Sequence, residues 1–187
     1  MRKLFTPRFI FITSAILIAA FSRMIPHMQN FSPLGAIGLF GAAHLTKKWQ
    51  AFLIPILATF LSDLFINNVI YAQYYPHFTW FYEGFYWQYI SYLLIIITGI
   101  FLLKKTDTPR IVIAALSSTV IFFLVSNIGC WVGNPAYPQN IAGLMTCYNA
   151  GVPFIQGTLL GDLFYSGVLF GAFYLTQVKF PTLVGVK

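Results

Sequence analysis

Charged side chains are scarce in this sequence. They make up 8% of the 187 residues, whereas 58% of the residues are hydrophobic and 19% are aromatic. A soluble globule of this size cannot bury so many apolar side chains, so this composition excludes one. The few Lys and Arg residues occur in short clusters between long apolar runs, which indicates orientation in a lipid bilayer and excludes nucleic-acid binding. The sequence therefore predicts an integral membrane protein.

Cysteine and the common catalytic motifs are also lacking. Cys130 and Cys147 are too few and too far apart for a zinc site, although they could form a single disulfide bond. The sequence contains no HExxH, no GxSxG and no glycine-rich phosphate loop, and the residues around its aspartates do not resemble the intramembrane aspartyl proteases. We therefore expect no enzyme activity and no cofactor of its own, and the sequence defines no metal site.

The apolar runs predict one domain over residues 1–187, an all-α bundle of six transmembrane helices. The predicted helices cover residues 9–25, 32–46, 49–71, 86–103, 111–128 and 153–177. Residues 141–151 are too few to span and predict a short half-helix at the outer interface, with Pro153 opening the sixth helix. The basic start followed by an apolar run could instead be a signal peptide, but a retained first helix agrees better with the charge pattern below.

Positive charge is distributed very unevenly between the two predicted sides. One side carries ten of the basic residues: Arg2, Lys3, Arg8, Lys47, Lys48, Lys104, Lys105, Arg110, Lys179 and Lys187. The other side carries Arg23 alone. By the positive-inside rule, both termini are expected in the cytoplasm of a bacterial cell, and the protein is expected to cross the inner (cytoplasmic) membrane several times.

Two acids lie inside predicted membrane helices, where a charge normally marks a partner or a functional site. Residues 58–65 read ATFLSDLF and residues 157–164 read GTLLGDLF, so Asp63 and Asp162 occupy matching positions. The two segments cross in opposite directions, as in an inverted repeat of two three-helix halves with a site between them. Arg23 is the natural partner of these acids, and the interaction could be structural, could hold a ligand, or could do both.

Other side chains on the outer side complete the set of candidate ligand-binding residues. The polar candidates near the two acids are His27, Asn30, Asn67 and Gln156, and those in the outer loops are His77, Trp80, Trp87, Trp131 and Tyr148, with Tyr74 beside them. The aromatic residues between positions 72 and 88 suit either an interfacial belt or a lid over a ligand. Either cysteine, or His77, could also bind a metal-containing ligand.

Three segments carry a family resemblance: RMIPHMQNFSPLGAIGLFGAAHL at residues 23–45, PILATFLSDLF at 55–65 and AGLMTCYNAGVPFIQGTLLGDLFYSGVLFG at 142–171. Together they resemble an uncharacterised family of small bacterial membrane proteins that are usually labelled transporters. This resemblance implies no catalytic or binding residue.

In architecture the sequence is similar to the substrate-capture subunits, or S components, of energy-coupling factor (ECF) transporters. These six-helix proteins bind vitamins or metal ions near the outer face and dock on an energising module. Many use an Ala-x-x-x-Ala surface on the first helix, which Ala15 and Ala19 match in spacing. A cobalamin-specific branch places an outer cysteine on cobalt, for which the resemblance offers Cys147 or His77 as counterparts.

The sequence therefore predicts a protein that captures a small nutrient, such as a vitamin or cofactor precursor, with a cobalamin-type ligand among the candidates. Uptake would require an energising partner, because no nucleotide-binding signature is present. One alternative is a secondary transporter that uses Asp63 and Asp162 as proton or sodium sites. Another is a membrane scaffold without transport, in which both acids are structural.

Overall fold

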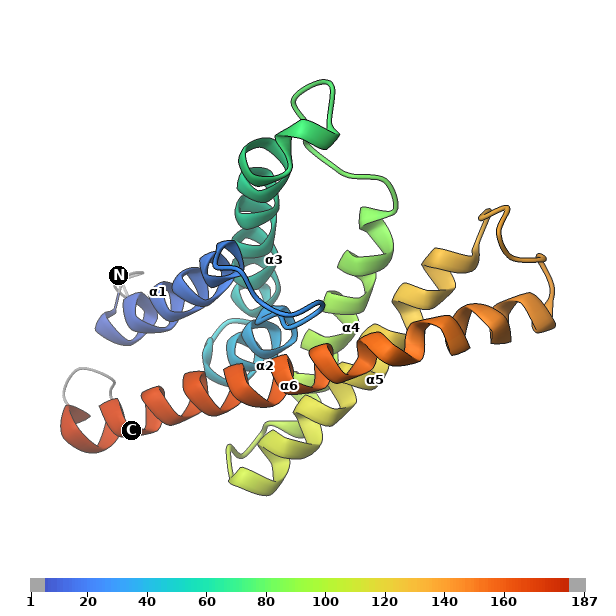
Figure 1. The fold of residues 1–187 in the computed structure, drawn as a ribbon. Helices are drawn as coiled ribbons and strands as arrows, with labels where there is room; N and C mark the ends of the chain where they lie inside the picture. The colour runs from blue at the N-terminus through green and yellow to red at the C-terminus, as the bar shows by residue number, and fades with distance from the viewer. Residues whose placement is uncertain (1–5, 182–187) are drawn as a thin grey trace.

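The computed structural model describes residues 6–181, and every regular element in that range is helical (Figure 1). The six α-helices are α1 (Pro7–Phe21), α2 (Leu34–His44), α3 (Lys48–Phe65), α4 (Phe85–Leu102), α5 (Thr108–Trp131) and α6 (Ile141–Lys179). The 3₁₀ turn Ser22–Met24 follows α1. A π-helical turn, Ile66–Ile70, extends α3, and a second 3₁₀ turn, Ala72–Tyr74, comes after it. The all-α prediction is confirmed.

Five of these helices, all except α2, are long and apolar enough to cross a membrane. Helix α2 has 11 residues and is therefore about 17 Å long, roughly half of the hydrocarbon thickness. The helix predicted at residues 32–46 is therefore present, but it is too short to span the membrane by itself. Residues 25–33, which end in Pro33, directly precede α2 and have no regular structure beyond a turn. These residues therefore cover the part of the path between the loop after α1 and α2 that a full-length helix would otherwise occupy.

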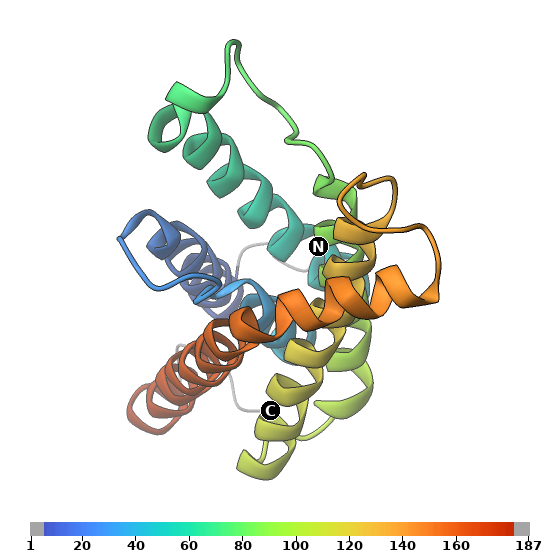
Figure 2. The same cartoon turned by 45° about the vertical axis from the view of Figure 1, so that its right-hand side comes forward.

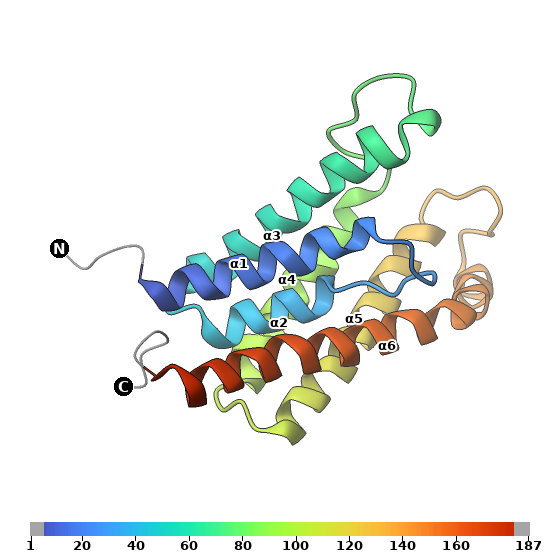
Figure 3. The ribbon, with the colours of Figure 1, turned by 60° about the vertical axis from the view of Figure 1, so that its left-hand side comes forward.

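The two ends of the bundle differ in charge and in chain connections (Figure 3). At the end that we call the basic end, α1 begins, α6 ends, and short connections join α2 to α3 and α4 to α5. The basic residues described there are Arg8, Lys47, Lys48, Lys104, Lys105, Arg110 and Lys179. Arg2, Lys3 and Lys187 lie outside the described residues. The opposite end, which we call the loop end, holds Arg23 and the three longer connections.

Helix α6 is longer than the sequence predicts. It begins at Ile141, where the Asn140 side chain caps it by accepting a 3.0 Å hydrogen bond from the Gly143 amide, and it continues through Pro153. The predicted separate half-helix is therefore wrong. Its residues pack against α5, where the Tyr148 hydroxyl donates to the Leu124 carbonyl oxygen at 3.0 Å. This packing holds the helix together across a proline that lacks a hydrogen-bond donor.

Helix α2 forms the centre of the bundle and contacts each of the other five helices. Its small residues permit this, because a side chain at Gly41 would collide with the ring of Pro55 on α3. Ile37, Leu39 and Phe40 are completely buried between the surrounding helices. Figure 2 shows α3 and α4 spreading apart toward the connection that joins them. The bundle is thus tightly packed around α2 and wider at the loop end.

Candidate functional site

A cavity of about 680 Å³ opens at the loop end. Its walls come from the connection between α1 and α2, the start of α2, the π-helical turn after α3, and helices α4, α5 and α6. This volume lies within the range that small-molecule sites usually occupy. The polar residues on its wall are Arg23, His27, Gln29, Asn30, Ser32, Tyr71, Gln88, Tyr92, Ser118, Thr158 and Asp162.

The connection between α1 and α2 forms one wall by lying flat against α6. A Cβ atom at Gly161 would lie 2.7 Å from the Ser32 nitrogen, and a Cβ atom at Gly157 would collide with the Gln29 carbonyl oxygen. The Phe31 ring adds an aromatic contact with Phe164, with 5.6 Å between ring centroids. Only glycine permits so close an approach of two backbones, so Gly157 and Gly161 determine where this wall lies.

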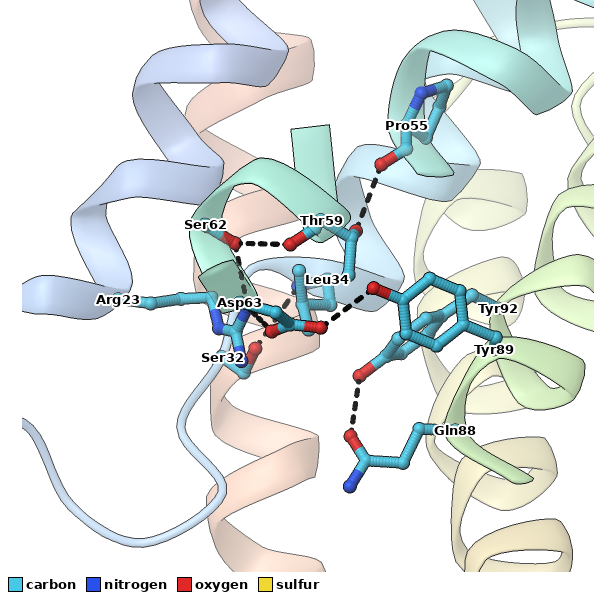
Figure 4. Close-up of polar contacts among 10 residues, drawn as sticks. All are labelled: Arg23, Ser32, Leu34, Pro55, Thr59, Ser62, Asp63, Gln88, Tyr89 and Tyr92. Carbon is cyan, nitrogen blue, oxygen red and sulfur yellow. Dashed lines mark hydrogen bonds and ion pairs between the residues drawn. The ribbon is translucent and has the colours of Figure 1, made fainter. Parts of the chain in front are cut away.

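Asp63 lies behind the cavity wall in a closed polar cluster (Figure 4). One of its oxygens, Oδ1, is 2.6 Å from Arg23 Nη1, and the other, Oδ2, accepts a 2.9 Å hydrogen bond from the Tyr89 hydroxyl. Arg23 Nη1 also donates to Ser62 Oγ at 2.8 Å. The side chains of Arg23 and Asp63 are 16% and 6% exposed. The predicted pairing of Arg23 with a membrane acid is therefore found at Asp63, with both carboxylate oxygens occupied.

Asp162 has different surroundings at the floor of the cavity. It is 2% exposed, and its Oδ2 accepts a 2.9 Å hydrogen bond from Thr119 Oγ1. Its Oδ1 lies at the start of α2, where a Cβ atom on Gly35 would collide with both Oδ1 and Ser118 Oγ. The positive end of a helix dipole favours a carboxylate there. Asp162 forms no ion pair with any residue in 6–181, so Arg23 is not its partner.

The floor around Asp162 contains further polar groups that sequence reasoning did not identify. Ser118 Oγ is buried beside Asp162 Oδ1 and interacts with that carboxyl group, although not as a hydrogen bond of good geometry. On the α4 side, the Tyr92 hydroxyl donates to Gln88 Oε1 at 3.3 Å (Figure 4). One available signal was the polar run of residues 117–119 within an otherwise apolar helix, because polar groups in membrane helices usually face the protein interior.

Four of the predicted ligand-binding residues do line the cavity, namely Arg23, His27, Asn30 and Asp162. Asn30 sits at a turn in the α1–α2 connection with a positive φ of 59°, a conformation that asparagine tolerates better than most residues. The other predicted residues do not line it: Asp63, Asn67, His77, Trp80, Trp87, Trp131, Tyr148 and Gln156. The cavity thus gathers the predicted residues nearest α1 and α6, and not those of the outer loops.

The outer aromatic residues have structural contacts or face outward. The Trp87 ring lies against Gly129 on α5, and Trp131 Nε1 donates to the Pro138 carbonyl oxygen at 2.9 Å. Tyr74 and Trp80 are exposed, as are His77 and Gln156.

The connection that carries several of these residues, 71–84, is attached to the π-helical turn. Asn68 binds the Thr79 backbone there through Nδ2 and Oδ1, at 2.9 and 2.6 Å. Burial raises the pKa of Tyr82, and the nearby Asp63 carboxylate raises it further. Tyr71, at the start of this connection, lines the cavity, whereas the exposed aromatic residues farther along it suit an interfacial belt.

Two further candidate features are not found in the structure. Ala19 is buried in the core and Ala15 packs against it, so these two residues do not form an outward docking surface on α1. Cys130 and Cys147 are both free, because Cys130 is exposed at the end of α5 while the Cys147 thiol is buried and donates to the Asn127 carbonyl oxygen at 3.4 Å. Among the described residues, no three His, Cys, Asp or Glu side chains cluster as metal ligands do.

The inverted-repeat prediction has limited support. Asp63 and Asp162 lie on helices that run in opposite directions (Figure 3). The halves nevertheless differ, because α2 has 11 residues and its counterpart α5 has 24. The similarity is therefore confined to the segments that carry the acids.

Fold and cavity together define a helical membrane bundle with a buried carboxylate at the floor of a small-molecule-sized cavity. The chain belongs to the family of unknown function DUF6580, whose model matches residues 3–183. Neither a curated protein nor a solved structure matches it.

Proposed function

We propose that this protein captures a small molecule from the outer side of the bacterial cytoplasmic membrane, for uptake with the help of an energising partner. The main support for this proposal is the cavity of about 680 Å³ at the loop end, with Asp162 buried at its floor. Its volume suits a compact ligand, and its wall mixes apolar side chains with a few polar groups, as ligand sites do. In this proposal the loop end faces outward, because it carries little positive charge.

Within the nutrient class, the cavity favours a compact vitamin or cofactor precursor over a corrinoid. Neither Cys147 nor His77, the two residues considered for cobalt, lies on the cavity wall. Cys147 is turned toward Asn127, and His77 is exposed in the α3–α4 connection. A link to an ECF-type module remains part of the proposal and would need a docking surface other than Ala15 and Ala19.

Mass spectrometry of small molecules that co-purify with the full chain tests capture directly. Thr158→Trp should fill the cavity and remove the bound compound, because Thr158 lines the wall. Leu160→Trp is the matched control on the same helix, because Leu160 is 49% exposed on the outer surface of the bundle. The proposal fails if the wild-type protein carries no compound, or if Thr158→Trp retains it as well as the control does.

Labelling with a membrane-impermeant maleimide tests the orientation. Cys130 is exposed at the loop end and Cys147 is buried, so intact spheroplasts should label at Cys130. Cys130→Ser should abolish the label and Cys147→Ser should retain it. Labelling that appears only after the membrane is broken would place the loop end in the cytoplasm and contradict the orientation.

An ion-coupled secondary transporter is the second candidate. It is favoured because Asp162 has no cationic partner among residues 6–181. Proteoliposomes that contain only this chain distinguish the two. Uptake driven by an imposed proton or sodium gradient would support the secondary transporter, whereas capture with a partner predicts binding without accumulation.

A further inference from the structure

We propose that the captured molecule is an organic cation, with an ammonium or amidinium group that binds at Asp162 and Ser118. This inference rests on the proposed function, because it assigns a chemical class to the ligand of the same cavity. The first support for an organic cation is the balance of charge on the cavity wall.

The groups around the cavity leave one carboxyl group, Asp162, without a cationic partner among residues 6–181. Arg23 is the only Lys or Arg that residues 6–181 contribute to the wall, and its charge is neutralised by Asp63 at 2.6 Å. His27 is exposed on the connection that forms the wall, and its Nδ1 lies 2.9 Å from the Met28 carbonyl oxygen. Asp162 has only hydroxyl groups and the start of α2 around it. A ligand with one positive charge would balance this wall.

The floor of the cavity also offers hydrogen-bond acceptors in the number that an ammonium group needs. Ser118 Oγ is completely buried beside Asp162 Oδ1 and interacts with that carboxyl group, and its lone pairs have no other donor of good geometry. Thr158 precedes Asp162 by four residues on α6, so the two side chains lie on one face of the helix and both line the cavity. An ammonium group has three donors, and these three side chains supply acceptors for them.

The remaining wall suits the organic body of such a ligand. The rings of Tyr92 and Phe122 stack with 6.0 Å between centroids and an interplanar angle of 10°, and both line the cavity. Aromatic faces attract cations and also accept apolar groups. Ile66, Ile95 and Phe154 extend the apolar wall.

A bare metal ion fits this cavity less well. Hard cations take about six oxygen ligands at short distance, whereas the described residues provide a single carboxylate, with the hydroxyl and amide oxygens distributed over the wall of a cavity of about 680 Å³. An organic cation uses both the charge at the floor and the apolar volume above it.

The experiment uses the full-length protein in detergent and a panel of primary amines, each paired with the alcohol of the same carbon skeleton, such as phenethylamine and phenethyl alcohol. Amines should raise the thermal unfolding temperature and their alcohols should not. Asp162→Asn should weaken amine binding by about thirtyfold or more, because it removes one partner of a buried charge pair. Asp107→Asn is the control, because Asp107 is exposed and distant from the cavity wall.

Ser118→Ala provides a second test if Asp162→Asn unfolds. It removes one neutral acceptor, so amine binding should weaken by roughly tenfold while the fold is retained. Alcohols that bind as tightly as their amines, or amine binding that survives Asp162→Asn, would overturn the inference.

Mass spectrometry separates the two proposals. A neutral or anionic compound that co-purifies and is lost in Thr158→Trp would overturn the cation inference and leave capture standing. A protein that binds no compound in either assay would overturn both.

Discussion

Asp63 and Asp162 occupy matching positions in similar segments, yet their surroundings are opposite. Asp63 has a guanidinium group and a phenol on its two oxygens and lies behind the cavity. Asp162 has no cationic partner among residues 6–181, and it lies on the cavity floor. Removal of one partner from a satisfied buried pair destabilises the fold, whereas a carboxyl group without a counter-charge is available to a ligand. The contacts support a structural role for the first acid, and the lack of a counter-charge at the second agrees with the binding role that we propose for it.

The residues that differ between the two segments explain this contrast. Ser62 precedes Asp63 and accepts a 2.8 Å hydrogen bond from Arg23. Gly161 takes the matching place before Asp162 and admits the backbone of Ser32. Ala58 likewise corresponds to Gly157, which admits the Gln29 backbone. One segment therefore completes an ion-pair cluster, and the other accommodates the loop that forms the cavity wall.

Arg23→Ala should produce the largest effect on stability. It leaves the Asp63 carboxylate buried without its cation, which costs about 3–5 kcal/mol of unfolding free energy. Thermal or denaturant unfolding in detergent measures the loss. Arg110→Ala is the matched control, because the Arg110–Asp107 pair is 43% and 47% exposed and such pairs contribute about 0–1 kcal/mol. Equal losses in the two variants would show that the Arg23–Asp63 pair is not structural.

Gly157→Ala should have the next largest effect. The new methyl group would collide with the Gln29 carbonyl oxygen, so the loop must shift, at a cost of about 1–3 kcal/mol and with weakened ligand binding. Gly171→Ala on the same helix is the control, because no atom lies within 4 Å of the added Cβ. There, alanine should leave the protein unchanged or stabilise it by up to about 1 kcal/mol. Similar behaviour of both variants would show that the loop does not need this contact.

The features that could be predicted from the sequence are those that depend on local composition. Apolar length predicts five of the helices, and the clusters of Lys and Arg predict which connections share an end. The scarcity of positive charge near the loop end also restricts any ion pair of the membrane acids to Arg23. Each of these inferences needs only a residue's type and its distance along the chain.

The features that could not be predicted depend on packing between distant segments. Which acid takes Arg23 depends on how the loop after α1 folds back against α6 at Gly157 and Gly161. Helix α2 is short because this loop occupies the space that a longer helix would fill. Helix α6 tolerates Pro153 because the helical turns before the proline pack on α5. Ser118 becomes notable only when α5 and α6 place it beside Asp162.

Asp162→Asn should have the smallest effect on stability and thereby gives the sharpest test of the comparison between the acids. No ion pair with a described residue is lost, and the Thr119 hydroxyl can still donate to the amide oxygen of asparagine. Removal of a buried charge also lowers the desolvation cost of folding. The unfolding free energy should therefore change by less than about 1 kcal/mol, as for a single neutral hydrogen bond. Unfolding of the ligand-free protein in detergent measures this change.

Asp63→Asn is the matched variant, since it makes the same substitution at the corresponding position. It removes the charge that Arg23 needs at 2.6 Å, so it should destabilise the protein by several kcal/mol, about as much as Arg23→Ala does. If both asparagine variants are equally destabilised, Asp162 has a structural role and the scaffold alternative gains support. If only Asp63→Asn is destabilised while Asp162→Asn loses its ligand, stability depends on one acid and binding on the other.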